Sequence, residues 1–254
     1  MCFAHDAVPP IPPVQGAAIT HERLHLTAAD GTRFVAFEAL SDAPGQGPGV
    51  VVLPDVRGLF SFYEELALRF AELGRDAVAI DYFGRTADDP PRSPDFDWSD
   101  DVMATTQEAI RQDVAAAIAR LRAADADRKI FTVGFCFGGS NSWHQAASGH
   151  GLAGAVGFYG HPLREGFPKG APAVAARVGD MECPILGLMG GDDPGIPDDA
   201  VEEYRGALDA AGVENEIVIY PGAPHSFFDR KADMFAVESA DAWARVTAFI
   251  AANE

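Results

Sequence analysis

The segment Gly134–Gly139, which reads Gly-Phe-Cys-Phe-Gly-Gly, is the feature that most constrains the fold of this chain. It follows an apolar run, Lys129–Val133, and opens a helix-like segment, Ser140–Ala147. A strand that runs through a sharp turn into a helix is a strained backbone motif. A reactive side chain in such a turn stands between glycines. We expect glycine two positions before and after Cys136, because a side chain at either place would collide with the neighbouring strand and helix.

Cys136 is a candidate nucleophile within this motif. The free N–H groups and the positive dipole end at the start of the following helix favour a thiolate at this position. The alternative is a buried cysteine in a glycine-rich turn, and the motif alone does not decide between the two. Partner residues elsewhere in the chain are needed for that decision.

The composition limits the class of protein and the kinds of partner. With 254 residues and 48% apolar side chains, the chain is long enough to bury one large core. A net charge of −19 without a basic cluster argues against nucleic acid as a partner. No apolar run is long enough to cross a membrane, so we expect no membrane partner either.

The N-terminal segment and the cysteines predict the domain boundaries and the location. Residues 1–20 lack the basic start and the apolar stretch of a signal peptide, and their prolines predict an extended arm. Residues 21–254 are expected to form a single domain, since no repeat or change of composition divides them. Three cysteines, at positions 2, 136 and 183, lack metal-ligand spacing and predict a cytoplasmic location.

Strand-like and helix-like segments alternate along most of the chain. This predicts an α/β fold with a mostly parallel sheet and helices on both of its faces. The expected strands are residues 21–27, 33–39, 50–54, 76–81, 129–133, 153–158, 184–189 and 216–220. The expected helices are residues 62–73, 105–123, 140–147, 198–211 and 237–251. Two long irregular stretches, 84–101 and 160–183, are interpreted either as segments that cover a substrate or as solvated loops.

Residues with complementary chemistry follow three of the expected strands. Cys136 ends one strand, an Asp-Asp pair at positions 192 and 193 follows another, and His225 follows the last one. In open α/β sheets, chemistry gathers at the carboxyl ends of the strands. An imidazole that takes the thiol proton and a carboxylate that fixes the imidazole tautomer would complete a catalytic triad with the cysteine.

The same motif predicts where a developing oxyanion would be held. The backbone N–H of Phe137 lies at the start of the helix, and a second N–H is expected from the loop Pro54–Gly58 after an earlier strand. Val56 is the expected donor in that loop.

Four motifs together resemble the dienelactone hydrolase family of α/β-hydrolases, spread from about Val50 to Phe249. They are Gly134–Gly139, Met189–Asp193, Gly222–Phe228 and Asp81–Arg85. The resemblance implies an α/β-hydrolase fold with a sheet of the eight-stranded type. It also implies a triad of Cys136, His225 and Asp193 that opens small lactones or esters through an acyl-cysteine without a cofactor. The family register selects Asp193, rather than Asp192, to orient His225.

The chain departs from the family pattern beside the expected nucleophile. Family members carry a glutamate after the strand that ends at Pro54, where it holds the resting thiol, and Asp55 stands here instead. Asp55 is therefore a candidate modulator of the thiol state. Arg57, Tyr82 and Arg85 are further candidates for the pocket.

A second departure concerns the recognition of a substrate carboxylate. Family enzymes for carboxylate-bearing dienelactones grip the substrate with two arginines. One is expected shortly after His225, where this chain reads Asp229-Arg230, and the other within residues 95–102, which contain no arginine. The candidate substitutes are Arg57, Arg85, Arg92 and Arg230, with an ordinary surface role as the alternative.

The sequence as a whole predicts a hydrolase that cleaves a small lactone, ester or thioester. Acyl transfer to an acceptor other than water and a non-catalytic binding protein of the same fold are the alternatives. No metal is expected, because the remaining histidines form no ligand pattern with carboxylates or cysteines. His161 follows a strand end, which leaves a pocket-lining role as the alternative to a surface or core position. A monomer or a small homo-oligomer is expected.

Overall fold

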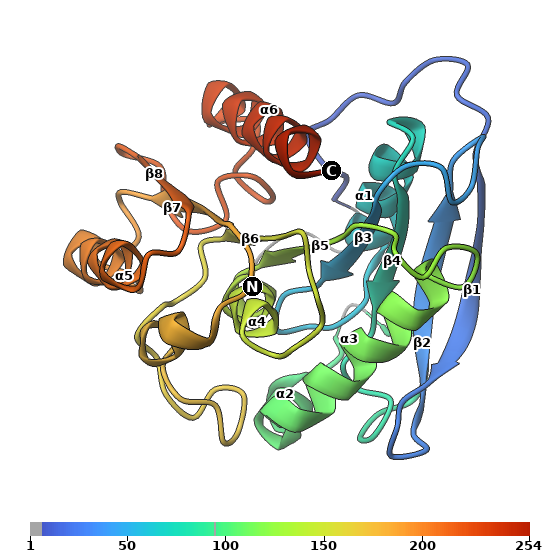
Figure 1. Ribbon diagram of the computed structural model, residues 1–254, viewed down its shortest axis with the longest axis horizontal. Coiled ribbons are helices and arrows are strands. Elements are labelled where there is room, and N and C mark those ends of the chain that lie inside the picture. The colour runs from blue at the N-terminus through green and yellow to red at the C-terminus, as the bar shows by residue number, and fades with distance from the viewer. Residues whose placement is uncertain (1–6, 94) are drawn as a thin grey trace.

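The computed structural model describes residues 7–93 and 95–254 and contains one central sheet (Figure 1). Its strand order is β1-β2-β4-β3-β5-β6-β7-β8. The strands are β1 (Thr20–Thr27), β2 (Arg33–Leu40), β3 (Gly49–Leu53), β4 (Asp76–Ile80), β5 (Ile130–Phe135), β6 (Gly154–Phe158), β7 (Ile185–Gly190) and β8 (Asn215–Tyr220). Strand β2 pairs antiparallel with β1 and β4, and all other neighbours are parallel. The predicted mostly parallel, eight-stranded sheet is confirmed.

Helices cover both faces of this sheet, as predicted (Figure 1). The helices are α1 (Ser61–Glu72), α2 (Ser99–Ala104), α3 (Gln107–Leu121), α4 (Phe137–Ala146), α5 (Asp198–Ala211) and α6 (Ala236–Asn253). On one face, α1 and α6 meet through Phe70 and Trp243, whose ring centroids are 4.9 Å apart. On the other face, α4 and α5 meet through Trp143 and Tyr204, at 5.0 Å. This double cover explains why every residue of β3 to β7 is buried.

Local signals in the sequence account for several element boundaries. The N–H of Gly31 donates to the carbonyl of Ala28 in the predicted β1–β2 hairpin, and Gly31 adopts a φ of 85°. The side chain of Thr106 caps α3 by accepting from the N–H of Ala109. Gly212 ends α5 with a left-handed φ of 72°. Helix α2 begins inside the first stretch predicted to be irregular and extends three residues beyond it, and a 3₁₀ helix at Val174–Asp180 lies inside the second.

The turn between β5 and α4 is crowded by backbone atoms. A Cβ at Gly134 would lie 1.9 Å from the carbonyl oxygen of Gly138, and one at Gly138 would lie 2.1 Å from that of Leu53. Cys136, between them, adopts a φ of 56°, and its N–H donates to the carbonyl of Phe158 at 3.0 Å. The steric reason for glycine on both sides of Cys136 is therefore confirmed.

The segment before β1 lies against the body of the protein. Residues 7–19 contain neither helix nor strand, and Ala7, Ile11 and Ile19 pack on the hydrophobic core. The N–H of Val14 donates to a carboxylate oxygen of Glu72 at 3.0 Å. The first six residues of the expected arm lie outside the described residues, and the division into an arm and one domain stays a prediction. Among the described helices, none has the length and apolar character needed to cross a bilayer.

We expect Gly134→Ala to lower the free energy of unfolding by about 3 kcal/mol, because the backbone of the turn must shift to admit the methyl group. Urea denaturation measures the change. The matched control is Gly206→Ala, since no atom lies within 4 Å of a Cβ added at that position in α5. The control is expected to gain roughly 0.5–1 kcal/mol from helix propensity. Equal stability of the two variants would contradict the steric argument.

Candidate active site

Cys136 lies at the carboxyl end of β5, in the N-cap position of α4. Its side chain is partly exposed to a cavity. The strained turn holds the sulfur beyond the end of the strand, and the first residue of the helix, Phe137, directly follows it. The sulfur is thus both accessible and close to the N–H groups at the helix start.

The structure brings His225 and Asp193 together from two neighbouring strands. Asp193 follows β7 and His225 follows β8, and His225 Nδ1 lies 2.5 Å from Asp193 Oδ2. The other oxygen, Oδ1, accepts from the N–H of Gly195 at 2.9 Å, and the Asp193 side chain is buried. Asp192 is exposed instead. A carboxylate held in this way can fix the imidazole tautomer so that Nε2 acts as the base.

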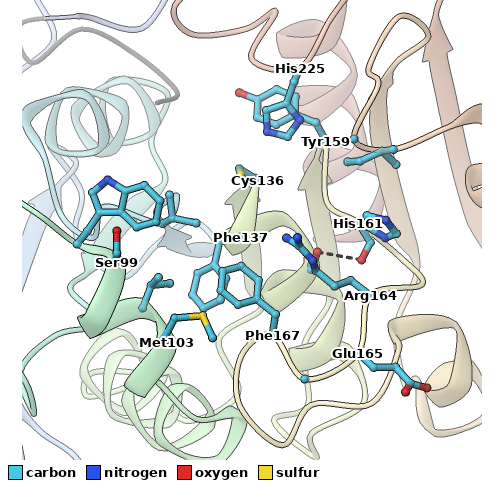
Figure 2. A pocket seen from close by; sticks show the side chains of 17 residues that line it. Ser99, Met103, Cys136, Phe137, Tyr159, His161, Arg164, Glu165, Phe167 and His225 are labelled. Carbon is cyan, nitrogen blue, oxygen red and sulfur yellow. Dashed lines mark hydrogen bonds between the residues drawn. The ribbon is translucent and has the colours of Figure 1, made fainter.

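Cys136 and His225 line one cavity of about 680 Å³ (Figure 2). Both long stretches that were interpreted as substrate covers or as solvated loops contribute to its walls. The first supplies Trp98 and, within α2, Ser99, and the second supplies Phe167. In Figure 2, His225 lies on one side of Cys136, and Phe137, Met103 and Phe167 lie on the other. Both stretches therefore line the cavity, and their role as substrate covers stays a prediction.

The two expected oxyanion donors lie at the same cavity. Val56 and Phe137 both line it. Val56 belongs to a tight turn in which the N–H of Gly58 donates to the carbonyl of Asp55 at 3.2 Å. The N–H of Arg57 donates to Asp55 Oδ1 at 2.9 Å in the same turn. These bonds fix the peptide that carries Val56 beside the start of α4.

Comparisons with known proteins match this arrangement over most of the chain. The model of the dienelactone hydrolase family matches residues 34–253. The chain belongs to this family. It is 29% identical, over 264 aligned residues, to a carboxymethylenebutenolidase of Rhodococcus opacus, with 98% of this chain and 96% of the relative covered. The resemblance carried by the four motifs is confirmed, and the protein is a hydrolase of carboxylic esters or lactones.

Solved structures agree with this assignment. A Klebsiella pneumoniae protein described as a "putative dienelactone hydrolase" is similar with a TM-score of 0.81 and 29% identity. The similarity covers 92% of this chain and 99% of that one. A dienelactone hydrolase-like promiscuous phosphotriesterase from metagenomic libraries gives a TM-score of 0.74 at 25% identity, covering 93% and 99% of the two chains.

The carboxylate of Asp55, the candidate modulator of the thiol state, binds Arg57, and its role towards the thiol stays a prediction. Asp55 is fully buried, and its Oδ2 lies 3.1 Å from the Arg57 guanidinium. The guanidinium also packs on the ring of Phe60, 5.2 Å from its centroid. Neither Asp55 nor Arg57 is among the residues that line the cavity. Their contacts stabilise the turn of Val56.

Tyr82 and Arg85 also lie outside the cavity wall, contrary to the expectation for the pocket. The Tyr82 hydroxyl donates to the carbonyl of Pro54 at 2.9 Å, and its ring packs perpendicular to Phe137 at 5.3 Å. Tyr82 therefore supports both expected oxyanion segments from behind. Arg85 faces away, because its guanidinium is paired with Asp113 at 2.8 Å and with Asp30.

Two other candidate arginines are likewise absent from the cavity wall. Arg92 is buried and makes two hydrogen bonds to Asp81, at 2.9 and 2.8 Å. Arg230 is exposed. The proposed substitutes for the family's arginine pair thus hold structural positions or face solvent.

Sequence reasoning missed Arg164, which lines the cavity (Figure 2). It lies on an exposed part of the second stretch, beside Glu165, and its guanidinium packs on the Phe167 ring at 5.0 Å. No local pattern marked this residue, because its place depends on how a long irregular segment folds back over α4. His161 lines the cavity, which was one of its two expected positions. The Ser140 hydroxyl donates a hydrogen bond to the backbone carbonyl of His161 at 3.2 Å.

We expect Asp193→Asn to lower kcat by on the order of 10⁴, because an amide at that position favours the wrong imidazole tautomer. Steady-state hydrolysis of an aryl ester measures the loss. Asp192→Asn is the matched control, because it removes the same charge from the neighbouring residue, whose side chain is exposed. Greater damage from Asp192→Asn would show that the other aspartate orients His225.

Proposed function

We propose that this protein hydrolyses small lactones, esters and thioesters through an acyl-cysteine formed on Cys136. The observation that carries the proposal is the 2.5 Å contact between His225 and Asp193 beside the cavity that Cys136 lines. A buried carboxylate, an imidazole and a thiol at a helix start are the three groups that nucleophilic acyl transfer requires.

In the first half-reaction, Nε2 of His225 takes the thiol proton and the sulfur attacks the substrate carbonyl carbon. The carbonyl oxygen becomes an oxyanion, which accepts hydrogen bonds from the N–H groups of Phe137 and Val56. The intermediate then collapses to a thioester on Cys136 and breaks the carbon–oxygen bond of the ester. His225 returns its proton to the departing alkoxide, which in a lactone stays attached to the acyl group.

In the second half-reaction, neutral His225 takes a proton from water, and the resulting hydroxide attacks the thioester carbonyl. The same two N–H groups hold the second oxyanion. The carbon–sulfur bond then breaks, the acid is released, and the thiolate regains a proton from His225. Amides are expected to react poorly, because the tetrahedral intermediate expels a thiolate more readily than an amine.

The cavity favours a substrate with an apolar body. Its wall is largely apolar on the side of α2 and Phe137, where the lining residues include Trp98, Val102, Met103 and Phe167. A volume of about 680 Å³ exceeds the needs of the smallest lactones, so aryl or branched esters also fit. Glu165 and His161 lie on the other side, and Arg164 reaches from there to the Phe167 ring (Figure 2).

A second candidate function with the same chemistry is acyl transfer to an acceptor other than water. It differs only in which nucleophile enters the second half-reaction, and product analysis with added alcohols or thiols separates the two. Membership of a hydrolase family counts against a non-catalytic binding protein. A cytoplasmic location, a monomeric or small homo-oligomeric state and independence from metals and cofactors stay predictions.

We expect Cys136→Ala to abolish hydrolysis and Cys183→Ala to leave it nearly intact. Burial raises the pKa of the Cys183 thiol to about 12, so this sulfur stays protonated and unreactive at neutral pH. Iodoacetamide should alkylate Cys136 first, and an activated ester should add its acyl mass to the same residue. Peptide mass spectrometry locates both modifications. Retained activity after selective alkylation of Cys136 would sink the assignment.

We also expect neutral lactones to exceed carboxylate-bearing dienelactones in kcat/KM. Arg164 is an exposed cation beside Glu165, so water and salt screen its attraction for an anion. The net charge of −19 offers no long-range attraction. Paired assays at low and high salt, with Arg164→Gln as the comparison variant, test this expectation. An anionic preference at both salt concentrations that Arg164→Gln removes would overturn it.

A further inference from the structure

A second buried carboxylate lies close to His225 and takes no part in the steps described above. Asp229 follows His225 by four positions and is only 6% exposed. Its Oδ2 accepts a hydrogen bond from the Tyr159 hydroxyl at 2.8 Å, and its Oδ1 accepts one from the N–H of Arg230. The carboxylate thus lies behind the cavity wall, with a partner on each oxygen.

Tyr159 connects this carboxylate to the imidazole. It directly follows β6, adopts a φ of 37° and lines the cavity. Its ring packs against the His225 ring with centroids 4.8 Å apart and an interplanar angle of 54°, and the two rings lie side by side in Figure 2. A non-glycine residue with positive φ persists only where its surroundings hold it.

We propose that Asp229 and Tyr159 are positioning residues for His225, in which Tyr159 fixes the face of the imidazole and the charge of Asp229 stabilises its protonated form. This proposal rests on the proposed function, because it assigns His225 the role of the base. It adds a second carboxylate to the one that already contacts His225 Nδ1.

The electrostatic surroundings make the charge of Asp229 sensitive to pH near neutrality. Burial raises the pKa of Asp229 to about 7, and the negative charge of Asp55, after β3, adds to the rise. The N–H of Arg230, the hydroxyl of Tyr159 and the charge of His225 act in the opposite direction. The Arg230 side chain is exposed and faces solvent.

The sign of the coupling follows from these charges. A protonated His225 and an ionised Asp229 attract, so ionised Asp229 raises the pKa of the imidazolium. Asp193 contributes the same kind of attraction from the turn after β7, through its direct contact with Nδ1. Removing the charge of Asp229 therefore lowers the imidazolium pKa while the contact with Asp193 remains.

Three variants separate the effect of the Asp229 charge, the effect of the Tyr159 hydroxyl, and the effect of replacing any aspartate in this segment. Asp229→Asn removes the charge but keeps an oxygen that can accept from Tyr159. Tyr159→Phe keeps the ring against His225 but removes the hydroxyl, which leaves the buried carboxyl more readily protonated. Asp233→Asn is the matched control, since this aspartate is exposed on the same segment.

The test is an NMR titration of the ¹⁵N-labelled imidazoles in the full-length protein, which needs no substrate. Asp229→Asn is expected to lower the imidazolium pKa of His225 by about 0.5 unit or more, a roughly threefold loss of proton affinity. Tyr159→Phe should shift it in the same direction, and Asp233→Asn should leave it unchanged. Melting curves establish that each variant is folded.

The second readout is the acid limb of the kcat profile for an aryl ester. Because deacylation needs neutral His225, a lower imidazolium pKa moves this limb to lower pH in Asp229→Asn and Tyr159→Phe. Unchanged titration and unchanged acid limbs in both folded variants would overturn the inference while leaving the proposed function intact. An inactive wild-type protein with a shifted titration would instead overturn the proposed function alone.

Discussion

The close approach of backbone to backbone between β5 and α4 is the constraint on which the active site depends. Glycine at 134 and 138 lets the chain reverse within van der Waals contact of Leu53, and this forces Cys136 to a φ of 56°. Such a conformation costs about 1–3 kcal/mol and persists only where packing over-determines it. The buried neighbours β3 and β6 and the fully buried helix α4 provide that packing.

The same parallel arrangement explains why much of the site could be predicted from the sequence. Apolar runs followed by polar residues place strand ends at one edge, and Cys136, Asp193 and His225 all follow such runs. The strands β7 and β8 are parallel neighbours in the sheet, so the turns that follow them bring Asp193 and His225 within hydrogen-bond distance. The alternation of segments predicted the sheet and its helices for a similar reason, as each long element carries its own periodic signal.

What could not be predicted is which charged side chains pair with one another. Arg57, Arg85 and Arg92 looked equivalent as candidates for an anion site, yet each is bound to a carboxylate, namely Asp55, Asp113 or Asp81. The partners lie 2, 28 and 11 positions apart in the sequence, so no common spacing marks them, and the pairings depend on side-chain directions that no local pattern encodes. The short helix α2 and the course of residues 160–173 are of the same kind, because both contribute to the cavity wall and neither carries a periodic pattern in the sequence.

Three buried carboxylates surround the reacting groups, and each has a different partner. Asp55 is paired with a guanidinium, Asp193 with the imidazole itself, and Asp229 with a tyrosine hydroxyl and a backbone N–H. The tyrosine hydroxyl and the backbone N–H are neutral, so they satisfy the hydrogen bonds of Asp229 without compensating its negative charge. Burial is therefore the largest influence on the protonation of Asp229. The field at His225 is therefore built from charges buried behind the wall of the cavity. The overall charge of −19 lies largely on exposed side chains, where water and salt screen it.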